Sequence, residues 1–283
     1  MAYLLASSLS VILMLTMLFG GCSIYREQPR NNDDANNARA VNPENASLSL
    51  FGNISAAGED PNNYLIIGDG SAFSYNNSRG TMNWVAWKTA RADLGESVER
   101  PDFRPDPRLP IRFVRVTSSD YSGSGYDRGH MVPAADRFAN LELLQETFLM
   151  TNIVPQSPSL NQYPWEKLES YARSQARRGW DIYQIAGVYG EQGILKNEVV
   201  VPTNCWKIIV MLRSGSDISY LNGRTRVIAV DMPNRDGMQN EKWQRYVTNI
   251  RSIEAKTGYN FFASLPADQQ ETLETRRELS FPR

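Results

Sequence analysis

Short apolar and aromatic runs recur along this chain of 283 residues, and they come in groups rather than alternating one by one with helical patterns. Runs of this length and composition are typical of β-strands. Strict alternation with helices would predict a parallel sheet, whereas grouped strands predict the α+β class, with a central mixed or antiparallel sheet flanked by helices. We expect strands at residues 64–67, 83–87, 112–116, 182–188, 198–201, 206–212 and 226–230.

Helical patterns occupy four other segments of the sequence. Within residues 164–178, Trp165, Leu168 and Ala172 recur at the three- and four-residue spacing of a helix face that packs on a core. This spacing predicts a helix with one buried side. We expect the helices at residues 138–150, 164–178, 241–257 and 267–278.

The first 21 residues have the composition of an export signal. They contain no charged side chain and hold a mostly apolar run from Leu4 to Phe19. The run ends in Gly20-Gly21-Cys22, which resembles a bacterial lipoprotein signal whose cysteine becomes the lipidated first residue. A plain signal peptide and an uncleaved membrane anchor are the alternatives, since about 20 apolar residues span a bilayer. All three predict export, to the cell envelope, the periplasm or the medium.

Residues 22–47 are expected to form a disordered tether between the export segment and a folded domain. Asn31 to Asn45 holds six asparagines and almost nothing apolar, so this stretch cannot bury enough surface to fold. Beyond it there is no internal repeat and no second linker of comparable polarity. We therefore predict one domain over residues 48–283.

The scarcity of two residue types excludes several classes of site. A single histidine cannot form a three-histidine zinc site or a Cys2His2 finger. Cys22 and Cys205 are too far apart in sequence for Cys-x-x-Cys redox chemistry. The formal net charge of −1 provides no global attraction to polyanions, so any such binding must depend on a local basic surface.

Arginine is the only basic residue type between Arg91 and Trp165 apart from the one histidine. Its planar fork suits two-point contact with phosphate oxygens, which lysine does not reproduce. Prolines interrupt the first part of the series, so the four-residue spacing of its arginines is not a helical face. The alternative for any single arginine is an ion pair with a nearby aspartate. The series comprises arginines 91, 100, 104, 108, 112, 115, 128 and 137.

The lone imidazole follows a glycine-rich stretch that runs from Tyr121 to His130. Its glycines permit a tight and unusual backbone path, and an Asp-Arg pair precedes the histidine by two residues. A histidine of near-neutral pKa can take a proton from water when something fixes its tautomer. On the residues alone, a structural histidine is the more common outcome of such a pattern.

The sequence Asp127-Arg128-Gly129-His130 resembles the motif of the DNA/RNA non-specific endonucleases, which are ββα-metal (His-Me finger) nucleases. Within that family the chain is most similar to the secreted, sugar-non-specific nucleases of the cyanobacterial type. The resemblance covers essentially residues 48–275 and implies the ββα-metal fold. It is carried by segments 74–87, 103–106, 121–130, 147–152 with 155–156, and 257–259, in the same order.

The resemblance implies a role for three side chains. His130 matches the general base that activates the attacking water. Asn161 matches the one side chain that binds the catalytic magnesium, the other ligands being water and phosphate oxygen. Glu169 matches the acidic residue that holds metal-bound water. The alternatives are that Asn161 caps the following helix and that Glu169 forms an ordinary surface ion pair with Arg173, four residues later.

Three further residues are candidates around this site. Arg100 matches the arginine that binds the scissile phosphate, although it precedes Phe103 by one residue fewer than in the family. Arg104 is its rival for that role. Arg128 contacts phosphate or pairs with Asp127, and Asp127 supports the loop rather than transferring a proton.

The resemblance implies an exported, Mg²⁺-dependent endonuclease, with Mn²⁺ as a substitute metal. Its substrates would be single- and double-stranded DNA and RNA, cut to leave 5′-phosphate and 3′-hydroxyl ends. Two alternatives stay open: a nucleic-acid-binding lipoprotein without turnover, and a phosphodiesterase acting on small nucleotides. The sequence does not specify an inhibitor protein or an oligomeric state.

Overall fold

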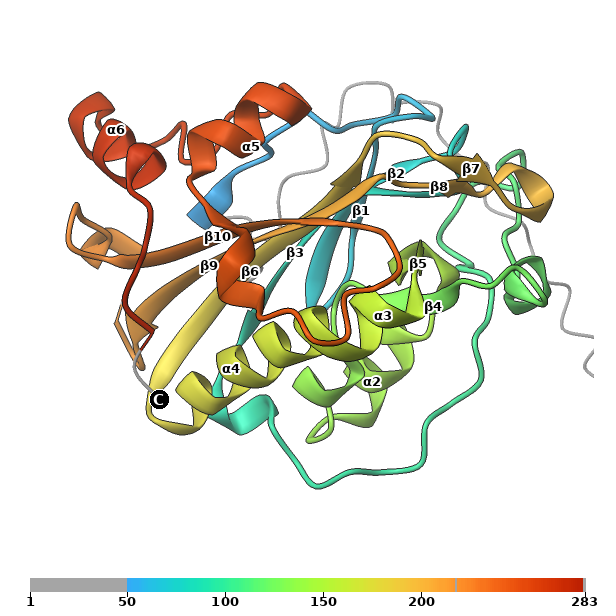
Figure 1. Cartoon of the computed structure of the whole chain (residues 1–283), viewed down its shortest axis with the longest axis horizontal. Coiled ribbons are helices and arrows are strands. Elements are labelled where there is room, and N and C mark those ends of the chain that lie inside the picture. Colours follow the sequence, from blue (N-terminus) through green and yellow to red (C-terminus); the bar gives the residue numbers. More distant parts are fainter. Residues whose placement is uncertain (1–49, 217, 282–283) are drawn as a thin grey trace, which may run out of the picture. The chain divides into compact units, whose positions relative to one another are not determined.

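A seven-stranded sheet forms the centre of the computed structural model, which describes residues 50–216 and 218–281 (Figure 1). Every pair of neighbouring strands in this sheet is antiparallel, so the expected mixed or antiparallel sheet is antiparallel throughout. The α+β class is confirmed. The strands follow the order β1 (Tyr64–Ile67), β2 (Ser71–Asn76), β3 (Thr81–Thr89), β6 (Trp180–Tyr189), β9 (Asn204–Arg213), β10 (Arg226–Pro233) and β11 (Val247–Thr248).

Helices cover both faces of this sheet, so apolar side chains are buried on each side (Figure 1). α4 (Glu166–Arg177) packs on one face, with Leu168 and Ala172 in the larger core cluster. α5 (Ile250–Thr257) and α6 (Ala267–Thr275) contribute Ile253 and Leu273 to a second cluster on the opposite face. The three-four pattern that predicted a buried helix side is therefore confirmed for α4.

The predicted strand at residues 112–116 is wrong. The segment forms a turn, in which the Phe113 amide donates to the Pro110 carbonyl and the Val114 amide donates to Asn77 Oδ1. Phe113 and Val116 are buried from this loop rather than from a strand. Apolar content therefore marked burial here but not β-structure. Residues 198–201 likewise contain only the short β8 (Val200–Val201), which pairs with β7 (Gly193–Ile194).

The expected helix at residues 241–257 begins nine residues late, at Ile250. Its first half is a 3₁₀ turn (Trp243–Tyr246) followed by β11. Asn249 accounts for the late start, because its side chain accepts a hydrogen bond from the Ser252 amide and caps α5. The helix expected at 138–150 is α2 (Leu141–Thr147), capped in the same way by Asn140.

A smaller unit of two strands and a helix lies against the main sheet. β4 (Asp127–His130) pairs antiparallel with β5 (Ile153–Gln156), and the chain then enters α3 (Pro158–Leu160), a π-helical turn (Asn161–Trp165) and α4. This is a ββα arrangement, and it contains the Asp-Arg-Gly-His motif on its first strand. Within the described residues, no helix is both long and apolar enough to cross a bilayer. The predicted export segment and tether lie outside the described residues.

Candidate active site

The Asp-Arg-Gly-His motif forms β4, whereas the glycine-rich stretch before it takes the unusual backbone path that its composition indicated, with positive φ at Gly123 and Gly125. Gly129 stands opposite Val154 in the β4–β5 pair, and its glycine is needed for close packing rather than for an unusual backbone angle. A Cβ at this position would lie 2.1 Å from Gln156 Oε1. The strand can therefore approach the neighbouring side chain only because residue 129 has none.

His130 ends β4 in a pocket of aromatic rings. Its ring centroid lies 5.3 Å from that of Phe103 and 4.8 Å from that of Phe148. Burial, and to a lesser extent the charge of Arg100, lower the pKa of His130 from 6.5 to about 4. The imidazole is therefore neutral at physiological pH, as a general base must be before it takes a proton.

One ring nitrogen of His130 lacks a partner. Nε2 is buried and has no hydrogen-bond partner among the described residues. The residue as a whole is only partly buried. A histidine that acts as a base needs a group that fixes its tautomer. No side chain among the described residues forms such a hydrogen bond with His130. Packing between Phe103 and Phe148 positions the ring instead.

Of the two candidate arginines, Arg100 is the one whose charge acts on His130. Both side chains are exposed. The backbone of Arg104 is tied down, because its amide donates to the Phe148 carbonyl and its carbonyl accepts from the Met150 amide. These two bonds hold the neighbouring Phe103 beside His130. The role of Arg100 in binding phosphate, with Arg104 as its rival, stays a prediction.

Arg128 does not pair with Asp127. Its Nε and Nη2 donate to the Ser118 carbonyl at 3.2 and 2.7 Å, and its guanidinium lies 5.7 Å from the centre of the Phe103 ring. Nη1 has no hydrogen bond within the described part of the chain. Arg128 is therefore a fixed cation on the same side of the strand as Phe103 and His130, with one nitrogen free.

Asn161 is not a helix cap. Ser157 caps the helical segment, because its Oγ accepts from the Leu160 amide, and Asn161 has helical backbone angles four residues further on. It begins the π-helical turn that contains Pro164. Turns of this kind widen a helix locally and often occur at functional sites. The backbone thus places Asn161 at an irregular point of the helix.

Asp127 determines which way the amide of Asn161 faces. Asn161 Nδ2 donates to Asp127 Oδ2 at 2.9 Å, and Gln162 Nε2 donates to the same oxygen at 2.8 Å. A carboxylate can only accept, so the NH₂ group of Asn161 must face Asp127. Its Oδ1 then faces away and accepts no hydrogen bond from the described residues. The predicted supporting role of Asp127 thus has a specific form, which is to orient Asn161.

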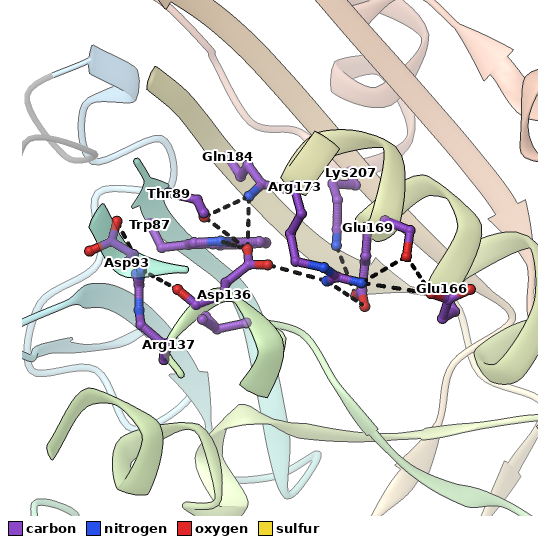
Figure 2. Close-up of polar contacts among 12 residues, drawn as sticks. Trp87, Thr89, Asp93, Asp136, Arg137, Glu166, Glu169, Arg173, Gln184 and Lys207 are labelled. Atoms are coloured by element: carbon purple, nitrogen blue, oxygen red, sulfur yellow. Dashed lines mark hydrogen bonds and ion pairs between the residues drawn. The ribbon is translucent and has the colours of Figure 1, made fainter. Parts of the chain in front are cut away.

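Glu169 is not a surface ion pair. Its side chain is 11% exposed and meets Lys207, which is fully buried, at 3.2 Å between Oε1 and Nζ (Figure 2). The predicted partner Arg173 is also present, but at 3.9 Å and from inside the core. Burial raises the pKa of Glu169, and the positive charges of Lys207 and Arg173 oppose that shift.

Asp136 joins this group from the other side. Its carboxylate accepts hydrogen bonds from Trp87 Nε1 and Thr89 Oγ1, and its Oδ1 lies 3.2 Å from Arg173 Nη1 (Figure 2). Arg173 therefore lies between two buried carboxylates. Its guanidinium is buried and does not form part of a basic surface on α4.

Lys207 and Asp136 were not identified from the sequence. Lys207 is the only charged residue in the run from Cys205 to Leu212, which forms the core of β9. A single charge inside an apolar strand is the signal that could have found it, since a buried charge requires a partner. No comparable signal marks Asp136, because its partners lie in distant strands.

The donor set at Asn161 fits a hard divalent cation. Magnesium takes oxygen ligands, keeps several waters and accepts a neutral amide oxygen. Asn161 Oδ1 is such an oxygen, and Asp127 holds it in place. Within the described ranges, no group of three or more His, Cys, Asp or Glu side chains is placed to hold a metal ion. Asn161 is thus a residue that could hold a metal ion here.

A polar recess of about 410 Å³ adjoins this region. Tyr126, the residue before Asp127, lines it together with Ser157, which caps the helix of Asn161. Asn234 and Arg235 form part of the remaining wall. The recess therefore provides space beside the strand and the helix end that carry the candidate residues.

Replacing Asp127 with asparagine should lower the affinity for Mg²⁺ by about 10- to 100-fold, the usual effect of removing the partner of a metal ligand. The new amide can donate as well as accept, so it no longer determines which atom of Asn161 faces it. Calorimetric titration with Mg²⁺ measures the change. Gln162→Leu is the matched control, because it removes the second bond to Asp127 but leaves Asn161 oriented. Equal losses in both variants would contradict the orienting role.

Comparisons with known proteins relate this chain to nucleases. Residues 56–268 match the family model described as DNA/RNA non-specific endonuclease. A nuclease of Nostoc sp. is 44% identical over 232 residues, which span 80% of this chain and 84% of that protein. Nuclease C1 of Cunninghamella echinulata is 29% identical over 242 residues, which span 79% of this chain and 90% of that protein.

Human mitochondrial endonuclease G is 34% identical over 179 residues, covering 59% of this chain and 58% of that protein. A chain in the crystal structure of the EndoG/EndoGI complex superposes with a TM-score of 0.63 at 23% identity. That match covers 72% of this chain and 88% of the other, and it shows the same fold. Nucleases of the matched family are metal-dependent. By the extent of the family match and the identity to the Nostoc nuclease, the chain belongs to the DNA/RNA non-specific endonucleases.

Proposed function

We propose that this chain is an exported, Mg²⁺-dependent endonuclease that hydrolyses DNA and RNA, single- and double-stranded, to 5′-phosphate and 3′-hydroxyl ends. Mn²⁺ would serve as a substitute metal. The observation that carries the proposal is the hydrogen bond between Asp127 and Asn161, which turns an amide oxygen outward beside the strand that ends in His130. Strand geometry separates Asp127 and His130 by only about 10 Å.

The proposed base is His130 Nδ1. With its proton on Nε2, the neutral ring accepts a proton from water at Nδ1, because a lowered pKa keeps that nitrogen unprotonated. An anionic phosphate bound nearby would raise the pKa of His130, since a neighbouring negative charge favours the imidazolium. Substrate binding thus strengthens the base when it is needed.

Arg100 and Arg128 bind the phosphate in this proposal. Arg100 is exposed and acts electrostatically on His130, and Arg128 has Nη1 free while its other nitrogens are held by Ser118. Both cations stabilise charge on the phosphate oxygens as it increases in the transition state. Asn161 Oδ1 would hold the Mg²⁺, which adds charge stabilisation at the phosphorus and the leaving oxygen.

Substrate breadth follows from contacts to the backbone of the nucleic acid. Phosphate contacts carry no sequence information, and they make binding weaken with salt. The residues proposed to contact substrate, metal or water are arginines, an amide and an imidazole, so the proposed recognition is of phosphate. Because the net charge is −1, binding should depend on these individual arginines rather than on overall charge.

Export is supported by the uncharged segment from Leu4 to Phe19, with Cys22 as the proposed site of lipid attachment. Lipidation would tether the enzyme to the membrane, and cleavage without it would release the enzyme. Labelling of cells with a radioactive fatty acid tests this. Label that persists in Cys22→Ser would argue against attachment at that residue.

Removing the metal should abolish cutting of both polymers. The purified chain is incubated with supercoiled plasmid and with structured RNA, each with Mg²⁺ and with excess chelator, and the products are separated on gels. We expect nicked and linear plasmid and short RNA fragments with Mg²⁺ only. Cutting that survives the chelator would contradict metal dependence. Failure to cut either polymer would favour a binding protein, and cutting of dinucleotides alone would favour a small-nucleotide phosphodiesterase.

A further inference from the structure

Lys207 lies in the middle of the central sheet, where a charge is least expected. Its neighbours across β9 are Ala186 on β6 and Val230 on β10, and its side chain is completely buried. The Nζ atom lies 4.4 Å from the centre of the Trp165 ring and 5.1 Å from that of Trp87. The one hydrogen bond that it forms with the described residues is to Glu169 Oε1, at 3.2 Å.

Packing alone does not require lysine at this position. The side chains on either side of it along the same face of the strand, Cys205 and Ile209, are apolar and fully buried. A methionine has similar length and would fill this space without burying a charge. Replacing buried ion pairs by apolar residues is often neutral for stability. The charge of Lys207 therefore calls for an explanation other than packing.

The other oxygen of Glu169 has spare accepting capacity. Oε2 makes no hydrogen bond in the described part of the chain and lies 3.9 Å from Arg173 Nη1. Glu169 is two helical turns beyond Asn161 on the same helical segment, and 11% of its side chain remains exposed. It is thus a carboxylate held at one oxygen, with the second able to accept another hydrogen bond.

We propose that Lys207 is a positioning residue for the nuclease reaction, which holds Glu169 in place as a carboxylate so that its second oxygen can accept from the hydration shell of the metal site. This inference rests on the proposed function of the same site. Lys207 itself contacts neither substrate nor metal. Its role is exerted through Glu169, and the indole rings of Trp87 and Trp165 pack near its ammonium group.

Burial disfavours the ionised form of Glu169, and three charged groups act on it as well. Lys207 on β9 and Arg173 on α4 favour the carboxylate, whereas Asp136 disfavours it, and Glu166 shares Arg173 at 3.7 Å. Arg173 is shared between three carboxylates, so it cannot replace Lys207. Without Lys207, burial would raise the pKa of Glu169 further. The carboxylate would then be lost at lower pH and regained as the pH rises.

The test is Lys207→Met in the full chain. We expect kcat to fall about 10- to 100-fold near neutral pH with a smaller change in KM, as for other partners of groups at a metal site. The loss should shrink as the pH is raised, since Glu169 ionises again. Glu169→Gln alone should also lower kcat, and adding Lys207→Met to it should change kcat little, because the two residues act as one unit.

Ile209→Ala is the matched control for damage to the core. It opens a cavity on the same face of β9 and should lower the unfolding temperature, but kcat below that temperature should stay near wild type at every pH. A Lys207→Met enzyme with unchanged kcat would overturn the proposal. So would a loss that does not depend on pH, or one that is equally large in the Glu169→Gln background.

Thermal unfolding provides a second readout that does not require turnover. A buried Glu169 without Lys207 prefers to be protonated in the folded state, so Lys207→Met should lose stability as the pH rises. Glu169→Gln should remove that pH dependence. If the wild-type chain cuts no nucleic acid, the proposed function fails, whereas the unfolding data still show whether Lys207 holds Glu169 ionised. An unfolding difference that is constant with pH would overturn the pairing itself.

Discussion

His130→Ala should lower the rate of cleavage of DNA and RNA by about 10²- to 10⁴-fold, which is the usual contribution of a positioned general base. The reason is local, since His130 is the only imidazole of the chain and its pKa of about 4 keeps it neutral. No carboxylate forms a hydrogen bond with its ring among the described residues. In the His130→Ala variant, no described carboxylate hydrogen-bonded at this position could therefore take the proton from water instead.

The measurement is the single-turnover rate on plasmid and on RNA at saturating Mg²⁺. Thermal unfolding is followed in parallel, because the alanine leaves a space between Phe103 and Phe148 and should lower stability modestly. A fall in rate that is no larger than tenfold, with the protein folded, would contradict the role of His130 as base. Equal loss on both polymers is expected, since the base acts on water and not on the sugar.

Asn161→Leu should lower the rate by about 10³-fold or more and abolish measurable Mg²⁺ binding. Leucine has nearly the shape of asparagine but no oxygen, so the change removes the metal ligand without a large change in volume. Charge stabilisation by a metal contributes several kcal/mol to such reactions, and about 1.4 kcal/mol corresponds to tenfold in rate. Asp127 then loses one of its two donors but keeps Gln162.

Gln162→Leu is again the matched control, because this neighbouring amide also donates to Asp127 but is exposed and is not the proposed ligand. It should cut at close to the wild-type rate. Rates and Mg²⁺ titrations of the two variants are compared under the same conditions. Normal Mg²⁺ binding by Asn161→Leu would show that the metal attaches elsewhere.

Patterns formed by residues close together in the sequence predicted most of the central strands and the buried side of α4. The strands at 64–67, 182–188, 206–212 and 226–230 lie within β1, β6, β9 and β10, because continuous burial in a sheet core requires continuous apolar sequence. The buried stripe of α4 followed from its spacing. The segment at 112–116 failed, because its apolar residues are buried from a turn whose hydrogen bonds go to Pro110 and Asn77.

The candidate residues of the site required the family resemblance, and their arrangement required the structure. From sequence spacing alone, Asn161 could be either a metal ligand or the cap of the following helix. The structure excludes the cap, because Ser157 caps this helical segment. The four-residue spacing of Glu169 and Arg173 correctly predicted that the two side chains lie close together, but it did not predict that they are buried. The buried ion-pair partner of Glu169 is Lys207, which lies on a strand 38 positions away in sequence. Such a contact across the fold leaves no local pattern.

In the proposed mechanism, Asn161 holds the metal and His130 handles the proton. Calorimetric titration of the His130→Ala variant with Mg²⁺ tests it most directly. The predicted result is an affinity for Mg²⁺ equal to that of the wild-type chain, in a protein that has lost almost all cleavage of DNA and RNA. Loss of Mg²⁺ binding together with cleavage would place the imidazole at the metal and contradict the account.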